Sequence, residues 1–269
     1  MTGGALRRPW TLFALGVPIG FASSLAGIGG GLFAGSILHF LCGFELRRAT
    51  GTALVLVWAT TFAATVTEST QAASALDWSA IAALVPGVLV GAQLGFIASE
   101  RLPDRALKAV FAVCLLYGSF RLIAGGGAPA GGALGLDEAS GWQRAAIAFV
   151  VGVGGGLATP VLGVGGGMVM VPGLLFGVGL GFDAARASSL AAGCVSSTRS
   201  LVLKSRAGRV TWRFGLYLGA GALLGSAAGV TAIDGNPELV EVGRWILAGV
   251  LGFIGLRFLR ELLRRTAQA

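Results

Sequence analysis

Long apolar runs separated by short polar stretches extend along the whole chain. Runs such as 53–66, 81–98 and 145–157 reach, with their flanks, the roughly 20 residues that an α-helix needs to cross a bilayer. The pattern therefore predicts an all-α polytopic membrane protein with about ten hydrophobic segments. We place them at residues 10–26, 28–43, 49–68, 78–99, 104–124, 143–162, 165–182, 186–204, 212–232 and 239–259.

The second half of the chain repeats the pattern of the first. The motif Gly27-Ile28-Gly29-Gly30-Gly31 returns 136 residues later as Gly163-Val164-Gly165-Gly166-Gly167. Further matches follow in the same order: Phe44-Glu45 and Arg48-Ala49-Thr50 with Phe182-Asp183 and Arg186-Ala187-Ser188, and Gly87, Gly91 and Gly95 with Gly221, Gly225 and Gly229. This order predicts two five-segment repeats, residues 1–124 and 143–269, joined by a linker loop at 125–142.

The loops of the two repeats carry opposite charge. The loop 199–213 is strongly basic, whereas its counterpart near 69–77 has no Lys or Arg. Conversely, the loop 233–241 is acidic and its counterpart at 100–108 is basic. Because basic loops stay in the cytoplasm, we expect both termini to be cytoplasmic and the two repeats to be inverted relative to each other. Inverted repeats are typical of secondary transporters.

The two glycine motifs predict breaks in the hairpins that contain them, because each glycine weakens a helix by about 1 kcal/mol. Each hairpin either crosses the bilayer or re-enters it. Backbone N–H groups at such breaks suit a small anion, and two breaks in inverted repeats predict a binding site near the midplane. Close helix packing is the alternative use of these glycines. The candidate substrate-binding residues are Gly27, Gly29, Gly30, Gly31, Thr52, Thr159, Gly163, Gly165, Gly166, Gly167, Ser189 and Cys194.

Ionisable residues near the segment ends are candidates for attracting or gating the anion: Arg48, Arg186 and Arg199. Arg48 and Arg186 are matched across the repeat, and the alternative is a salt bridge to Glu45 or Asp183, or snorkelling. Glu68 and the single histidine, His39, are weighed as proton-coupling residues against a solvated helix end and an apolar packing position.

Composition limits the remaining function classes. Hydrophobic residues make up 55% of the chain and charged ones 12%, with a mean hydropathy of +0.81. The net charge of +8 is assigned to membrane topology rather than to nucleic acid. Three dispersed cysteines and one histidine predict no metal site, and the chain has neither a Walker lysine nor a nucleophile with a histidine partner. We therefore expect no enzyme activity and no cofactor.

The motifs resemble those of the TauE/SafE family of sulfite-exporter-like membrane permeases (the 4-toluene sulfonate uptake permease type). The similar stretches are GIGGGLFAGSIL, RRATGTALV, ALDW, GVGGGMVMVPGLL and AGRVTW. The resemblance implies a multi-pass transporter of the bacterial inner membrane for sulfite or organosulfonates. In the family the first motif often runs on to Val-Pro, as at Val171-Pro172, but here Gly35-Ser36 stand there.

Three hypotheses follow. The first is a secondary transporter that exports a sulfur-containing anion by rocking of the two halves, with a proton or a sodium ion as the coupling ion. The second is an anion channel on the same scaffold, which single-channel currents would reveal. The third is a membrane assembly factor, against which direct anion binding would count. The sequence does not determine the oligomeric state.

Overall fold

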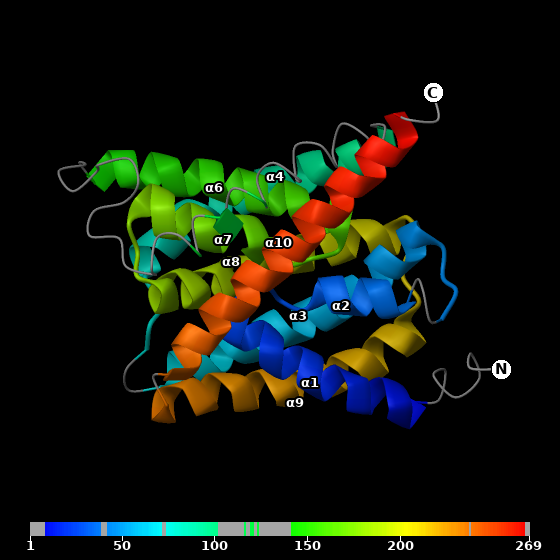
Figure 1. The fold of residues 1–269 in the computed structure, drawn as a ribbon, viewed down its shortest axis with the longest axis horizontal. Coiled ribbons are helices and arrows are strands. Elements are labelled where there is room, and N and C mark those ends of the chain that lie inside the picture. The colour runs from blue at the N-terminus through cyan, green and yellow to red at the C-terminus, as the bar shows by residue number, and fades with distance from the viewer. Residues whose placement is uncertain are drawn as a thin grey trace.

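The computed structural model describes residues 9–38, 42–71, 74–101, 141–236 and 238–266, with the isolated positions Leu116, Ser119, Phe120 and Ile123. Within these residues the chain is helical and has no strand (Figure 1). The elements are α1 (Pro9–Ala26), α2 (Gly31–Ser36), α3 (Leu46–Thr70), α4 (Trp78–Arg101), α6 (Gly141–Leu162), α7 (Gly167–Gly173), the π-helical turn η3 (Leu174–Val178), α8 (Phe182–Arg206), α9 (Trp212–Gly235) and α10 (Glu238–Thr266). His39, most of the predicted segment 104–124 and most of the linker 125–142 lie outside the described residues.

Six of these helices are long and apolar enough to cross a membrane: α1, α3, α4, α6, α9 and α10. The prediction of a polytopic membrane protein is thereby confirmed. The helix α8 is as long as α3, at 25 residues, but it carries many hydroxyl and charged side chains. Most of these side chains are buried inside the bundle, so that protein encloses the polar face of α8.

The segments that begin with the glycine motifs are short helices. α7 has 7 residues and is followed by the 5 residues of η3. At 1.5 Å per residue these elements span roughly 18 Å, well below the ~30 Å of a hydrocarbon core. This length favours re-entry over a full crossing. The left-handed backbone at Gly30 and Gly166, with φ of 74° and 76°, ends each break and starts the short helix.

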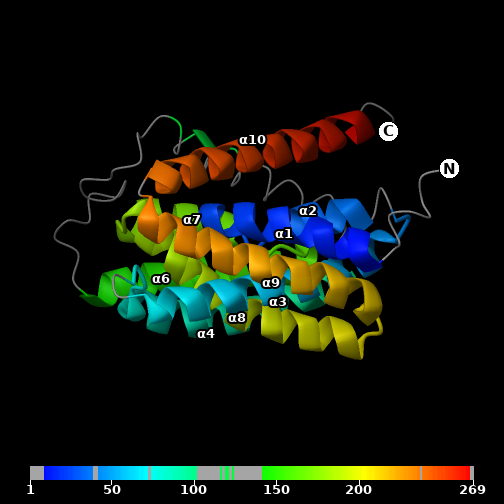
Figure 2. The ribbon, with the colours of Figure 1, turned by 90° about the horizontal axis from the view of Figure 1, so that it is seen from below.

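The helices run in directions that an inverted repeat requires. Figure 1 shows α1 running from right to left and α6 from left to right, with α3 and α8 likewise opposed. The start of α1 and the end of α10 lie at the same end of the bundle. α1, α2, α3 and α4 thus correspond to α6, α7, α8 and α9. Figure 2 shows α10 on one face of the bundle, where Ser119 donates to the carbonyl oxygen of Ala248 at 2.9 Å.

The helices pack in two groups that differ from the two sequence repeats. Group A consists of α1, α2, α3 and α9, and group B consists of α4, α6, α7 and α8. Two hydrophobic clusters follow this division in the main: one joins Leu12, Ala53 and Leu218, and the other joins Leu84, Ala148 and Met170 and extends to Ala26 of α1 and Leu247 of α10. α4 comes from the first half of the chain but packs in group B, and α9 comes from the second half but packs in group A.

Rows of glycines allow α4 and α9 to pack closely on their neighbours. A Cβ atom at Gly87 would collide with the carbonyl oxygen of Phe149 in α6, and one at Gly221 would collide with that of Phe13 in α1. Such contacts bring helix backbones together at a distance that no side chain allows. Gly87, Gly91 and Gly95 thus pack α4 closely on α6, and the matched series in α9 packs on α1 in the same way.

Gly225→Ala is expected to destabilise the protein by about 1–3 kcal/mol, because its Cβ would overlap the backbone oxygen of Val17. Gly249→Ala is the control, since no atom lies within 4 Å of a Cβ there and a helical alanine gains up to about 1 kcal/mol. Thermal melting of both variants in the same detergent makes the comparison. Equal melting temperatures would contradict the packing role.

Candidate functional site

The two groups meet mainly where α3 packs against α8, at the centre of the bundle. Hydroxyl groups are concentrated at this interface, including Thr60 and Thr61 on α3 and Ser196 and Ser197 on α8, all of them buried. Such polar side chains at membrane depth are expected only where protein encloses them. The interface is therefore the part of the fold in which a polar substrate could be held.

The two glycine motifs contact each other across this interface. A Cβ at Gly31 would overlap the carbonyl oxygen of Gly163, and a Cβ at Gly167 would overlap that of Gly27. The two contacts are equivalent, because 136 residues separate each partner from its counterpart. The motifs therefore lie around a local two-fold axis. In this conformation both serve the close packing of the groups, which was the alternative role considered for them.

A pair of hydroxyls lies on the same axis. Thr61 Oγ1 is 3.5 Å from Ser197 Oγ, and these two residues are also counterparts in the repeat. Thr61 Oγ1 donates to the carbonyl oxygen of Val57 at 2.7 Å, and Ser197 Oγ donates to that of Cys194 at 3.1 Å. The glycine motif is adjacent, since a Cβ at Gly29 would lie 3.2 Å from the methyl group of Thr61. The half-buried Cys194 side chain also contacts Thr61.

The three other predicted hydroxyls hold neighbouring elements together. Thr159 Oγ1 donates to Gly155 O at 2.9 Å and accepts from Ser196 Oγ at 2.8 Å. Ser189 Oγ donates to Gly27 O at 3.1 Å, which links α8 to the first glycine motif. Thr52 Oγ1 accepts the backbone N–H of Thr211 at 3.0 Å. Thr52 and Ser189 thus lie toward opposite ends of the interface, away from the Thr61–Ser197 pair.

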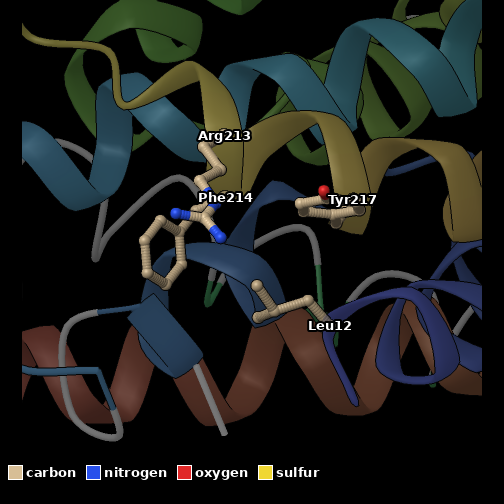
Figure 3. Close-up of a pocket in the computed structure, with 4 residues that line it drawn as sticks. All are labelled: Leu12, Arg213, Phe214 and Tyr217. Atoms are coloured by element: carbon tan, nitrogen blue, oxygen red, sulfur yellow. The ribbon is translucent and has the colours of Figure 1, made fainter. Parts of the chain in front are cut away.

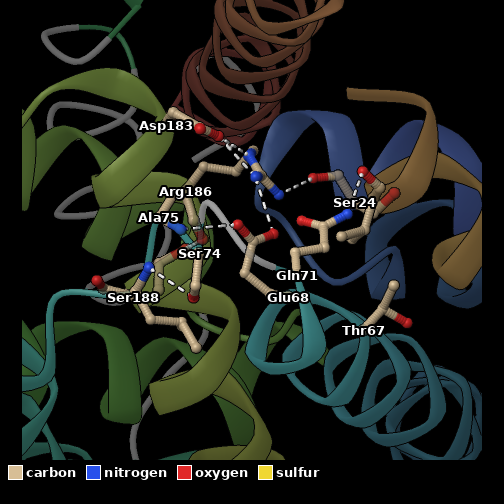
Figure 4. Close-up of polar contacts among 12 residues, drawn as sticks. Ser24, Thr67, Glu68, Gln71, Ser74, Ala75, Asp183, Arg186 and Ser188 are labelled. Atoms are coloured by element: carbon tan, nitrogen blue, oxygen red, sulfur yellow. Dashed lines mark hydrogen bonds and ion pairs between the residues drawn. The ribbon is translucent and has the colours of Figure 1, made fainter. Parts of the chain in front are cut away.

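Arg186 is the centre of an ion cluster at the end of the bundle where α3 ends and α8 begins (Figure 4). Its side chain is 1% exposed, and its Nη2 lies 3.1 Å from Glu68 Oε2 and donates also to Asp183 Oδ1. Nη1 donates to the carbonyl oxygen of Ser24 at 3.3 Å. We call Arg186, Glu68, Asp183 and Ser24 the Arg186 cluster. The salt bridge to Asp183 weighed from the sequence is present, together with a second, buried partner.

Glu68 does not form a solvated helix end. It is 3% exposed, because the loop 74–77 folds over it and the N–H of Ala75 donates to Glu68 Oε1 at 3.1 Å. The same loop is fixed to α8 through the N–H of Asp77, which donates to Ser188 Oγ at 3.1 Å. The solvated helix end considered for Glu68 is wrong, because its position at the end of a segment does not reveal that Arg186 and the loop 74–77 cover it.

The carboxylate of Asp77 fixes the start of α4. Its Oδ1 accepts the backbone N–H groups of Ser79 and Ala80, each at 3.0 Å. Burial alone would raise the pKa of Asp77, but the hydrogen bonds from Ser79 and Ala80 outweigh it and the pKa lies below its ordinary value. The charged form is therefore retained, and it caps the helix that follows the loop.

A second ion cluster closes the opposite end of the interface. Glu100, at the end of α4, lies within 3.3 Å of Arg47, 3.6 Å of Arg209 and 3.8 Å of Lys204. The ammonium of Lys204, whose side chain is 2% exposed, also donates to Ser99 Oγ at 3.1 Å. We call Glu100, Arg47, Lys204 and Arg209 the Glu100 cluster. Lys204 is the counterpart of Glu68 in the repeat, so equivalent positions carry opposite charges at the two ends.

The structure corrects the match between Arg48 and Arg186. Arg48 is exposed, and the start of α3 at Leu46 corresponds to the start of α8 at Phe182. The counterpart of Arg186 is Thr50: a Cβ at Gly27 would contact Arg186, and a Cβ at Gly163 would contact Thr50. The wrong pairing arose because both sequences contain an Arg-Ala pair near the helix start, two positions out of register.

Arg199 is part-buried and donates from Nη2 to Gln93 Oε1 at 2.8 Å, between α8 and α4. It therefore joins two helices of group B. Sequence reasoning did not single out Thr61, Lys204, Glu100 or Arg47 as site residues. The parallel between Thr60-Thr61 and Ser196-Ser197, 136 residues apart, could have identified the first of these.

A small surface cavity of about 230 Å³ lies elsewhere, near the starts of α1 and α9 (Figure 3). Leu12, Arg213, Phe214 and Tyr217 line it. The glycine motif follows the opposite end of α1, so this cavity is separate from the α3–α8 interface. In the described part of the chain, no three His, Cys, Asp or Glu side chains are grouped as a metal site would require.

Comparison with known proteins gives one family. The family described as "Sulfite exporter TauE/SafE" matches residues 2–122 and 147–269. The two matched stretches are separated by the region around the predicted linker. No curated protein and no solved structure matches the chain.

Glu68→Ala is expected to destabilise the protein by about 3–5 kcal/mol, because it leaves the guanidinium of Arg186 buried without its partner from α3. Glu241→Ala is the matched control: Glu241 is 65% exposed and its pair with Arg244 at 3.1 Å contributes at most about 1 kcal/mol. Glu68→Ala combined with Arg186→Met should recover much of the loss. Thermal melting tests all three, and a loss in Glu68→Ala no larger than in the control would contradict the buried pair.

Proposed function

Because this chain belongs to the TauE/SafE family of sulfite exporters, and is therefore a membrane transporter rather than an enzyme, we propose that it exports a small sulfur-containing anion such as sulfite or an organosulfonate. The mechanism proposed is that of a secondary transporter. The substrate is a small anion held inside the membrane, and the membrane is the inner membrane of a bacterium.

The observation that carries the proposal is the position of the Thr61–Ser197 pair. These two hydroxyls come from the two central helices, lie on the local two-fold axis, and adjoin the contact between the glycine motifs. A site on this axis is equally distant from both ends of the bundle, as alternating access requires. Hydroxyls and backbone N–H groups are donors that an anion of three oxygens can accept from, without a fixed positive charge that would hold it too tightly.

The proposed substrate site consists of the hydroxyl pair with the residues named from the sequence around it. These are the glycines of both motifs, Gly27, Gly29, Gly30, Gly31, Gly163, Gly165, Gly166 and Gly167, together with Cys194. The motifs are in contact in this structure, so the anion would enter as groups A and B move apart at one end. Thr52 and Ser189, nearer the ends, would then belong to the access paths, and Thr159 would hold Ser196 in place.

Two features support a carrier over a channel. The Arg186 cluster joins group A to group B at one end, and the contact between Arg47 and Glu100 joins them at the other. A protein closed at both ends corresponds to the occluded intermediate of a carrier. Alternating access would follow from rocking of the two groups about the α3–α8 contact, with one cluster opening while the other stays closed.

The orientation rests on charge. The end that carries the Glu100 cluster is rich in basic residues, among them Arg101, Arg206 and Arg213, and we assign it to the cytoplasm. Both chain termini then lie on the cytoplasmic side. The Arg186 cluster faces the periplasm, which is the exit for an exported anion.

Thr61→Val is expected to raise the KM for sulfite about tenfold to a hundredfold, since a hydrogen bond to a charged group contributes about 1.5–3 kcal/mol. Thr231→Val is the matched control. Both threonines donate to carbonyl oxygens three and four residues earlier in their own helices, but Thr231 is exposed on α9. The measurement is concentration-dependent flux of labelled sulfite in proteoliposomes.

Equal KM values for the two variants would remove Thr61 from the substrate site. Folded protein that moves neither sulfite nor a sulfonate such as taurine would defeat the substrate assignment. Single-channel currents in a planar bilayer would contradict the carrier mechanism and show that the protein is a channel.

A further inference from the structure

We propose that Arg186 is the anion-recognition residue at the periplasmic exit, and that the Glu68 carboxylate occupies the place of the transported anion there while this end is closed. Arrival of the anion at Arg186 displaces Glu68, and the displacement unlocks group A from group B. This inference rests on the proposed function and deepens it by assigning a second, peripheral anion site.

The chemistry of Arg186 suits the exchange. The guanidinium presents its donors in a planar fork that binds two oxygens of one anionic group. In the structure it donates to oxygens of Glu68, Asp183 and Ser24 and is almost fully buried. Sulfite and sulfonates carry oxygens of similar size and charge on a single central atom. They can therefore accept the same hydrogen bonds that Glu68 accepts now.

The partners of Arg186 divide between the two groups. Asp183 lies one turn before Arg186 on α8, in group B, and stays with it in any rigid movement. Glu68 on α3 and the Ser24 carbonyl on α1 belong to group A. Only the contacts to Glu68 and Ser24 must break when the groups separate. Because Asp183 is 39% exposed, the cluster also reaches the surface on the side to which an exported anion would be released.

Glu68 links this exchange to the overlying loop. Its Oε2 accepts a hydrogen bond from Arg186, and its Oε1 accepts one from the N–H of Ala75. One carboxylate therefore binds both α8 of group B and the loop 74–77. The loop is tied to α8 as well, through Asp77 and Ser188. When an anion takes the place of Glu68, the carboxylate leaves Arg186, and the only charged contact between α3 and α8 at this end is lost within the described residues. Opening at this end is thus coupled to binding.

The test is the accessibility of a cysteine beneath the cluster. Ser189→Cys is nearly isosteric, and Ser189 is buried three residues beyond Arg186 on α8. It is placed in a chain in which Cys42, Cys114 and Cys194 are replaced by alanine, and reaction with N-ethylmaleimide is followed in nanodiscs. Adding Glu68→Gln removes the competing charge and should raise the labelling rate at least about tenfold, because the open state is no longer a minor population.

Glu241→Gln is the matched control at the same end, since it removes an exposed acid that also pairs with an arginine of its own helix. It should leave the labelling rate unchanged. Equal labelling rates in Glu68→Gln and Glu241→Gln would overturn the proposal that the contact between Glu68 and Arg186 keeps this end closed. Melting temperatures of each protein verify that increased labelling does not come from unfolding.

Methanesulfonate is the probe for anion exchange, because it does not react with maleimide. It should accelerate labelling in the protein with Glu68 intact and have little further effect in Glu68→Gln, whereas chloride should do neither. No acceleration by methanesulfonate would overturn the exchange. Arg186→Lys keeps the charge but loses the fork, so the half-effective methanesulfonate concentration should rise about tenfold, and this variant serves if Glu68→Gln does not fold.

Labelling reports opening and does not require flux, which separates this inference from the proposed function. A response to methanesulfonate in a protein that transports no sulfur anion would support the exchange at Arg186 and overturn the proposed function. Transport of sulfite without any change in labelling would support the proposed function and overturn the exchange at Arg186.

Discussion

The contact between the two glycine motifs is the constraint on which the rest of the structure depends. The backbone of Gly31 touches that of Gly163, and the backbone of Gly167 touches that of Gly27, with no room for a Cβ at either place. Two such reciprocal contacts fix the local two-fold axis and bring α3 and α8 together. The Thr61–Ser197 pair on this axis, and the ion clusters at both ends of the interface, follow from that placement.

The exchange of α4 and α9 between the repeats changes how motion in this fold should be described. Glycine ridges bind α4 to α6 and α9 to α1 so closely that these pairs cannot separate without losing backbone contacts. The boundary between the groups is the α3–α8 interface, where backbones interlock at the glycine motifs and hydroxyls and ion pairs make most of the remaining contacts. A polar interface between two apolar clusters can open at less cost than the clusters themselves, because water can satisfy the groups that it exposes.

Sequence reasoning anticipated the local structure where the evidence was local or periodic. The positions of the helix breaks followed from the glycines, and the salt bridge between Asp183 and Arg186 followed from their spacing on one helix turn. It failed where the partner was distant in the chain. The burial of Glu68 depends on Arg186, which lies 118 residues later, and the pairing of Lys204 with Glu100 spans more than 100 residues. No local pattern encodes such contacts.

The sequence by itself determined that this chain crosses a membrane, that its hairpins break at the glycine motifs, and that the halves resemble each other. These properties follow from the hydropathy of the segments, from the loss of helix stability that glycine causes and from the repeated motifs, all of which can be read directly from the sequence. Only the tertiary structure decided that the motifs press against each other, which helices pack together, and which residue corresponds to Arg186. Those outcomes depend on how close two backbones can approach, and packing between distant segments sets that distance.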